Sequence, residues 1–104
     1  MGKSWCKPYK TGLPNNNSGI DLDRLSDGHL ALVCNPVGKN WGPRNPISLF
    51  LSKDNGDSWE KLADLDASKE KCEFSYPCVI ARGNTLHISY TWNRLNIAYW
   101  QLEL

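Results

Sequence analysis

The sequence lacks the pattern that would predict helices. No segment carries apolar residues at positions i, i+3, i+4 and i+7, which is the spacing of an amphipathic helix. It also lacks any apolar run near the roughly 20 residues of a membrane-spanning helix. Apolar residues still make up 40% of the 104-residue chain. That content suits one compact domain with a modest core and excludes a disordered chain.

An excess of charge of one sign is also missing. The chain has 12 Lys and Arg against 11 Asp and Glu, so its net charge is +1. Proteins that bind nucleic acid carry basic patches that neutralise phosphates, and no basic run occurs here. We therefore expect no nucleic-acid partner, and the absence of a long apolar run predicts no membrane partner.

Four cysteines are present, but metal and redox spacings are missing. Cys6, Cys34, Cys72 and Cys78 include no C-x-x-C pair and no zinc pattern, so we expect no metal and no cofactor. Cys34 and Cys78 lie in apolar strand patterns, which predicts buried, reduced thiols, with a Cys72–Cys78 bridge as the alternative. Reduced thiols and the lack of a signal peptide favour the cytoplasm, although the sequence does not fix the compartment.

What the sequence does contain is a series of short apolar stretches separated by turn residues. Asp27-Gly28, Gly83-Asn84 and Asn93-Arg94 predict tight hairpin turns. The expected strands cover residues 4–10, 19–25, 29–34, 47–51, 59–65, 76–81, 85–92 and 97–102. Residues 35–46 hold three Pro and two Gly and predict a long loop, while residues 66–73 form a charged linker. The predicted fold class is all-β.

Residues 52–59 carry the most closely specified turn. Their sequence fits the pattern S-x-D-x-G-x-(S/T)-W at all five specified places. The aspartate can accept hydrogen bonds from backbone N–H groups of a tight turn, and the glycine can adopt a positive φ. The serine after the glycine can close the loop, and the tryptophan can lie under the hairpin as an apolar plug. The structural residues of this turn are therefore Ser52, Asp54, Gly56, Ser58 and Trp59.

The start of the chain carries a shortened copy of this turn. Gly2-Lys3-Ser4-Trp5 repeats Gly56-Asp57-Ser58-Trp59 at an offset of 54 residues. A second echo relates Asp27-Gly28 and the strand after it to Gly83-Asn84, at an offset of 56. A repeat of about 50 residues has the length of one four-stranded propeller blade. We therefore expect a chain that begins in the middle of a repeat unit.

Together these motifs resemble the C-terminal blades of sialidase (neuraminidase)-like proteins, in the branch with BNR or Asp-box repeats. The matching segments are Ser18-Gly19-Ile20-Asp21, Asn35-Pro36, Arg44, residues 52–59, Ser75-Tyr76-Pro77 and Tyr90-Thr91-Trp92. The resemblance covers almost the whole chain and implies about two antiparallel blades of a six-bladed β-propeller. Residues 4–10 would be an outer strand of a preceding blade, 18–65 a complete blade, and 75–104 an incomplete last blade.

The resemblance also implies two site residues. In that family three arginines hold the substrate carboxylate, a tyrosine attacks the anomeric carbon, and an aspartate is the acid/base group. By position, Arg44 matches a carboxylate-binding arginine and Tyr76 matches the nucleophile. The plainer alternatives are a solvated loop arginine and an ordinary aromatic residue at a strand start. The other catalytic groups belong to earlier blades, so the isolated chain is expected to be inactive.

One departure from the family concerns the substrate. Sialidases usually have a glutamate directly after the tyrosine that matches Tyr90, whereas this chain has Thr91. The expected parent protein is an exo-glycosidase that acts on terminal acidic sugars, sialic acid first, with a glycan as its partner. The alternatives are a propeller enzyme for another uronide-type sugar and a non-catalytic carbohydrate-binding or interaction propeller.

The remaining candidates predict structural roles or self-association. Asp21 and Asp23 lie near the propeller mouth by strand position and are expected to be turn or hydrogen-bonding groups. His29 and His87 have no partners at metal spacing. The strand over residues 97–102 has no following strand, so its free edge invites pairing. We expect either residues 4–10 of the same chain or a second copy of the chain to fill that place.

Overall fold

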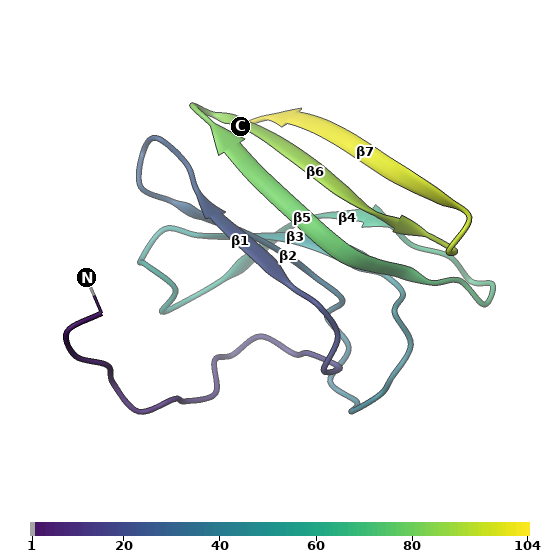
Figure 1. The fold of residues 1–104 in the computed structure, drawn as a ribbon, viewed down its shortest axis with the longest axis horizontal. Coiled ribbons are helices and arrows are strands. Elements are labelled where there is room, and N and C mark those ends of the chain that lie inside the picture. Colours follow the sequence, from purple (N-terminus) through teal and green to yellow (C-terminus); the bar gives the residue numbers. More distant parts are fainter. Residues whose placement is uncertain (1) are drawn as a thin grey trace.

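The computed structural model describes residues 2–104, which fold into two antiparallel sheets (Figure 1). The first sheet contains β1 (Asp21–Arg24), β2 (Leu30–Cys34), β3 (Ile47–Ser52) and β4 (Glu60–Asp66), in that order. Successive strands pair through short turns, and the predicted long loop joins β2 to β3.

The second sheet contains β5 (Phe74–Arg82), β6 (Thr85–Trp92) and β7 (Asn96–Glu103), also in sequence order. The described residues form no helix, and none of them makes up a helix that could cross a membrane. The prediction of an all-β fold is therefore confirmed, and all seven predicted strands after residue 18 are present with ends shifted by a few residues.

The hydrophobic core lies between the two sheets. Every residue of β2 and β3 is buried, because one face of the first sheet meets the second sheet and the other face is partly covered. The second sheet contributes inward-facing residues from all three strands, notably Val79, Leu86 and Ile88. A smaller cluster on the far face of the first sheet is made of Leu32, Cys34 and Phe50, with Leu13 and Trp59 packed against it.

The cysteine prediction is correct for one residue and wrong for another. All four thiols are free. Cys34 is buried, and burial raises its pKa to about 11, because the thiolate would lose its hydration. Cys78 is exposed, contrary to expectation. The reason is the alternation of β5, where Val79 and Ala81 point into the core and their neighbours point outward.

Two aspartates of β1 join the sheets. Asp21 Oδ2 accepts the N–H of Val79 at 2.8 Å, and Asp23 Oδ2 accepts the N–H of Ala81 at 2.7 Å. These bonds satisfy amides on the open edge of β5, and they hold the pKa of Asp23 below its usual range, chiefly through Ala81. The expected hydrogen-bonding role of both residues is therefore confirmed.

The turn over residues 52–59, the Asp-box turn, joins β3 to β4. Asp54 Oδ1 accepts hydrogen bonds from the Ser58 amide and the Ser52 hydroxyl, both at 2.8 Å, while the Ser58 hydroxyl donates to Oδ2. These bonds, with those from Ser58 first, lower the pKa of Asp54 to about 2. Gly56 has a φ of 94°, and its carbonyl accepts the indole N–H of Trp59 at 3.1 Å. The turn is thus closed mainly by its own residues, with one further hydrogen bond of 3.3 Å from Arg24 of β1 to the Asn55 side chain.

No strand forms over residues 4–10, contrary to the prediction. The segment has no neighbouring strand with which to pair, Pro8 cannot donate a backbone hydrogen bond, and Trp5 is 86% exposed. In Figure 1 this N-terminal segment (purple) runs well apart from β7 (yellow). Residues 4–10 therefore do not fill the free edge of β7 within the chain, and the alternative of a second copy stays a prediction.

Candidate functional site

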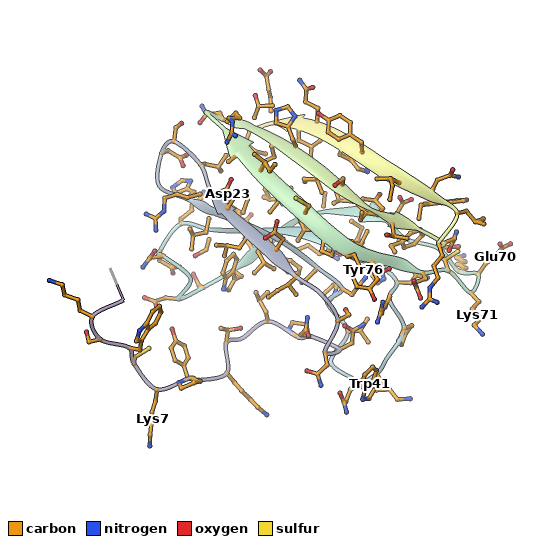
Figure 2. All side chains as sticks on the ribbon, in the orientation of Figure 1. Lys7, Asp23, Trp41, Glu70, Lys71 and Tyr76 are labelled. Carbon is orange, nitrogen blue, oxygen red and sulfur yellow. The ribbon has the colours of Figure 1, made fainter. Side chains whose placement is uncertain are left out.

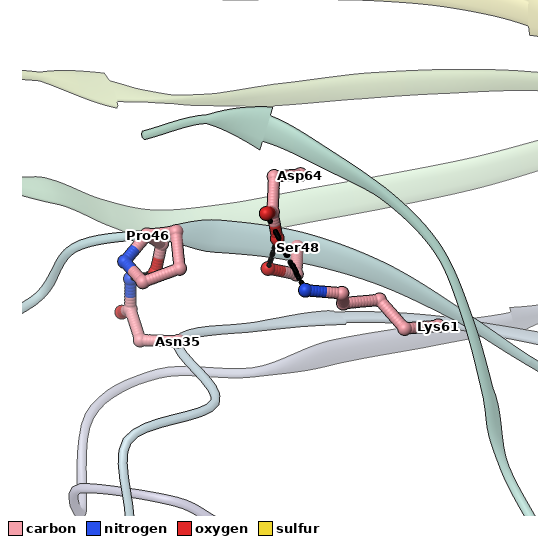
Figure 3. A network of polar contacts seen from close by, with 5 residues as sticks. All are labelled: Asn35, Pro46, Ser48, Lys61 and Asp64. Atoms are coloured by element: carbon pink, nitrogen blue, oxygen red, sulfur yellow. Dashed lines mark hydrogen bonds and ion pairs between the residues drawn. The ribbon is translucent and has the colours of Figure 1, made fainter. Parts of the chain in front are cut away.

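The loop over residues 35–46 is held in place by two buried asparagines. Asn35 Nδ2 donates to the carbonyl of Pro46 at 2.7 Å and to that of Phe74 at 2.9 Å, and Figure 3 shows its side chain next to Pro46. Asn16 Nδ2 donates to the carbonyl of Pro43 at 2.9 Å. The end of the loop and the start of β5 therefore have a fixed position relative to each other, and Arg44 lies between two of these anchor points.

A neighbouring polar network fixes the start of β3 beside that loop. The Ser48 hydroxyl donates to Asp64 Oδ1 at 2.6 Å, and Lys61 Nζ lies 3.1 Å from the same oxygen (Figure 3). Ser48, and after it Lys61, holds the pKa of Asp64 below its usual range. Because β3 begins directly after the loop, this network steadies the scaffold on which the loop sits.

The two residues expected at the site lie against each other. The Arg44 guanidinium carbon is 5.3 Å from the centroid of the Tyr76 ring, which is within the range of a cation–π interaction. The Arg44 carbonyl also accepts the N–H of Phe74 at 2.8 Å, so backbone and side chain both meet the start of β5. Figure 2 shows Tyr76 toward the same end of the molecule as Lys71, whereas Asp23 lies toward the other end of β5.

Tyr76 occupies a strained and exposed position. Its φ is 54°, a left-handed conformation that is unusual for an aromatic residue. The pairing of β5 with β6 shifts register between Ser75 and Cys78, so Tyr76 lies in an irregular part of the strand. Such irregularities re-aim side chains, and the tyrosine is 65% exposed as a result. Backbone strain of this kind concentrates at functional sites.

An ion pair beside these residues was not anticipated from the sequence. Glu73 Oε2 accepts hydrogen bonds from Arg94 Nε at 2.9 Å and from the Ser75 hydroxyl at 3.1 Å. The Arg94 guanidinium, more than any other group, holds the pKa of Glu73 below its usual range, and the charge of Arg44 adds to the effect. The pair joins a linker to a hairpin turn, so no local pattern could have predicted it.

Arg44, Glu73 and Arg94 line an open pocket of about 620 Å³, whereas Tyr76 contacts Arg44 but is not part of the lining. Its lining consists of Gly42, Pro43, Arg44, Lys71, Cys72, Glu73, Asn93, Arg94 and Leu95. Three cationic side chains against one carboxylate favour an anionic ligand, and a planar guanidinium suits a carboxylate in particular. Among residues 2–104, no three His, Cys, Asp or Glu side chains gather as metal ligands would.

The other candidates from the sequence lie elsewhere. Thr91 is half-buried in β6 and borders a separate shallow hollow with Arg94. His29 contacts Asp27 at 3.1 Å, and His87 shares a hydrogen bond of 2.6 Å with the hydroxyl of Tyr99. These contacts are local to the hairpins that carry them, so the histidines have structural partners.

The fold and the Asp-box turn define a BNR-type β protein, and the comparison with known families agrees. The family described as BNR repeat-like domain matches residues 1–88. This is more than half of the chain, so the chain belongs to the BNR repeat-like domain family, as its motifs predicted. None of the curated proteins matches the chain, and neither does any solved structure.

Proposed function

We propose that this chain supplies the carboxylate-binding part of a sialidase-like exo-glycosidase that acts on terminal acidic sugars, sialic acid first. The observation that carries the proposal is the contact between Arg44 and Tyr76 beside a cationic pocket. Two residues that the family resemblance places in one site are far apart in sequence, yet their side chains meet. The surrounding charge fits an acidic ligand.

In this proposal each residue has a distinct role. Arg44 binds the substrate carboxylate, since its planar guanidinium can donate two parallel hydrogen bonds. Tyr76 is the nucleophile: its hydroxyl gives its proton to a base outside this chain, and its oxygen forms a bond to the anomeric carbon as the glycosidic bond breaks. An acid, also outside this chain, protonates the leaving oxygen. The exposure of Tyr76 leaves its hydroxyl accessible to such a substrate.

The second candidate function is action on another uronide-type sugar. It is favoured by Thr91, which replaces the glutamate that sialidases usually have at this position. A non-catalytic carbohydrate-binding propeller would need Arg44 but no nucleophile. The two enzymatic candidates differ in the sugar that they bind, whereas the non-catalytic one differs in having no covalent step.

The binding half of the proposal is tested on the chain itself. An NMR titration would compare N-acetylneuraminate and glucuronate with galactose, a neutral sugar, in wild type and in Arg44→Gln. We expect both acids, but not galactose, to shift the side-chain Nε–H signal of Arg44 and the signals around Tyr76. An equal response to galactose, or no response to either acid, would overturn the proposal. A stronger response to glucuronate would favour the second candidate.

The catalytic half predicts no turnover by the isolated chain. The acid/base aspartate and two arginines of the family's site have no counterpart here, and catalytic groups that act together lose nearly all activity when most are removed. The measurement is release of a fluorophore from a sialoside by the purified chain. Turnover that disappears in Tyr76→Phe would contradict this expectation and would show that the chain is catalytically complete.

A further inference from the structure

The turn between β6 and β7 holds an arginine where glycine is favoured. Asn93 and Arg94 have φ values of 51° and 55°, and the amide of Leu95 donates to the carbonyl of Trp92 at 3.0 Å. Positive φ at both central residues is the geometry of a type I′ turn, in which Asn-Gly is the preferred pair. Asn93 fits this preference, whereas Arg94 does not.

Nothing in the packing of the turn explains the arginine. The Arg94 side chain is 74% exposed, and its contact with the fold is the bond from Nε to Glu73. Exposed ion pairs of this kind contribute little to stability. Backbone strain at a residue that contributes little to stability is typical of a ligand-binding position.

The neighbours of Arg94 position it for such a ligand. Of the Arg94 nitrogens, only Nε donates a hydrogen bond to Glu73. Among the described residues, no hydrogen bond engages the two terminal nitrogens of Arg94. Glu73 is itself held by the Ser75 hydroxyl, so the carboxylate is a fixed support for the guanidinium. Arg94 and Arg44 line the same pocket, and both act on the Glu73 carboxylate electrostatically.

We propose that Arg94 is a specificity-determining residue that makes a second contact with the acid group of the ligand, and that Glu73 is its positioning residue. This inference rests on the proposed function, because it concerns the same pocket and the same class of ligand. The family match ends at residue 88, so Arg94 lies outside the region on which the family assignment depends.

Arg94→Gly tests the inference, because glycine suits the backbone of the turn and removes only the side chain. The dissociation constant for N-acetylneuraminate would be measured by NMR titration, and the midpoint of urea unfolding would be measured in parallel. We expect affinity to fall roughly tenfold, the scale of one charge-assisted hydrogen bond, while the unfolding midpoint stays equal or rises. Arg24→Gln, an exposed arginine of β1 outside the pocket lining, is the matched control for affinity and should leave the dissociation constant unchanged.

Glu73→Gln tests the positioning role. Its amide keeps an oxygen that can accept a hydrogen bond but lacks the charge that pairs with Arg94. We expect the Nε–H signal of Arg94 to shift and the affinity to fall by less than in Arg94→Gly, with the unfolding midpoint nearly unchanged. An unchanged Arg94 signal would remove Glu73 from the proposal.

The outcomes separate this inference from the proposed function. If Arg94→Gly keeps the affinity while Arg44→Gln loses it, the inference fails and the proposed function stands. If Arg94→Gly lowers the unfolding midpoint without changing affinity, the arginine is structural and the inference again fails. If the wild-type chain binds neither acidic sugar, both fail together. Loss of affinity in both variants, with Arg24→Gln unchanged, supports both.

Discussion

The two sheets accommodate unusual backbone geometry with different kinds of residues. In the first sheet, the hairpin-turn residues with positive φ are Gly28, Asn55 and Gly56, which adopt it at low cost. The exception is Trp41 in the long β2–β3 loop, whose φ is 56°. In the second sheet, positive φ also occurs at Tyr76 and Arg94, for which it is costly. Both costly positions lie beside the cationic pocket. The hairpin turns of the first sheet therefore use residues suited to a positive φ, whereas one end of the second sheet bears backbone strain beside the proposed ligand site.

The outer edge strands of the two sheets differ in how well they are protected against pairing with another chain. The edge strand β4 has register shifts against β3 and carries Lys61 and Asp64, features that discourage pairing with another chain. The edge strand β7 pairs with β6 without interruption, has no Lys, Arg or Pro, and exposes Ile97 and Tyr99. The first sheet is therefore protected at its outer edge, and the second is open.

The largest expected effect is loss of stability in the Asp-box turn. Trp59→Ala should lower the free energy of unfolding by about 3 kcal/mol. This is the lower end of the range for truncating a large aromatic side chain, because Trp59 is only partly buried. Gly56→Val should lower the free energy of unfolding by roughly 1–3 kcal/mol, because valine does not readily adopt the positive φ. A steric clash adds nothing to this cost, since an added Cβ would lie 3.8 Å from the nearest atom. Chemical denaturation measures both changes.

The matched controls for that experiment are Arg44→Ala and Tyr76→Phe. Both change exposed or half-exposed groups of the candidate site, so we expect the free energy of unfolding to change by less than about 0.5 kcal/mol. Equal unfolding midpoints for all four variants would contradict the expectation that the Asp-box turn contributes more to stability than the candidate site does.

The next largest effect concerns the bonds between the sheets. Asp21→Ala and Asp23→Ala each leave an amide of β5 without its acceptor, which should cost on the order of 1 kcal/mol because the sites are only partly buried. Hydrogen exchange of the Val79 and Ala81 amides should accelerate in the corresponding variant. Asp57→Ala, an exposed aspartate whose side chain the Asp-box pattern does not specify, is the control. Unchanged exchange in both aspartate variants would show that the sheets do not depend on these bonds.

A smaller effect is expected for association through β7. We propose that two copies pair antiparallel along this edge, since uninterrupted, apolar edge strands favour such pairing. Light scattering should show a mass that rises with concentration and that returns toward the monomer value in Ile97→Lys, whose parent residue is 70% exposed. Leu62→Lys, on the charged edge strand β4, should have no such effect. A monomeric wild type at high concentration would refute the proposal.

The smallest effect is the acid dependence of the Asp-box turn. The pKa of Asp54 is lowered to about 2, so its ionised form stabilises the folded state. This contribution is complete above the unfolded pKa of about 4 and is lost as the pH falls through 2. The difference in unfolding midpoint between wild type and Asp54→Asn should therefore shrink between pH 5 and pH 2. A constant difference over that range would contradict the assignment.

The sequence alone determined the features that depend on near neighbours. Tight-turn residues and short apolar runs located the strands from β1 to β7, because strand pairing through short hairpins is encoded within a few tens of residues. The side-chain hydrogen bonds of Ser52, Asp54, Ser58 and Trp59 also lie within one turn, which explains why a pattern of eight residues could specify it. The family followed from the same local motifs.

Only the tertiary structure decided which distant residues meet. The contact of Arg44 with Tyr76, and the pairing of Glu73 with Arg94, depend on how the loop after β2 and the β6–β7 turn are placed against β5. The irregularity that exposes Tyr76 depends on pairing with β6, and residues 4–10 stay unpaired because no strand lies beside them. Such contacts are not encoded locally, since each partner's effect exists only after the sheets have packed together.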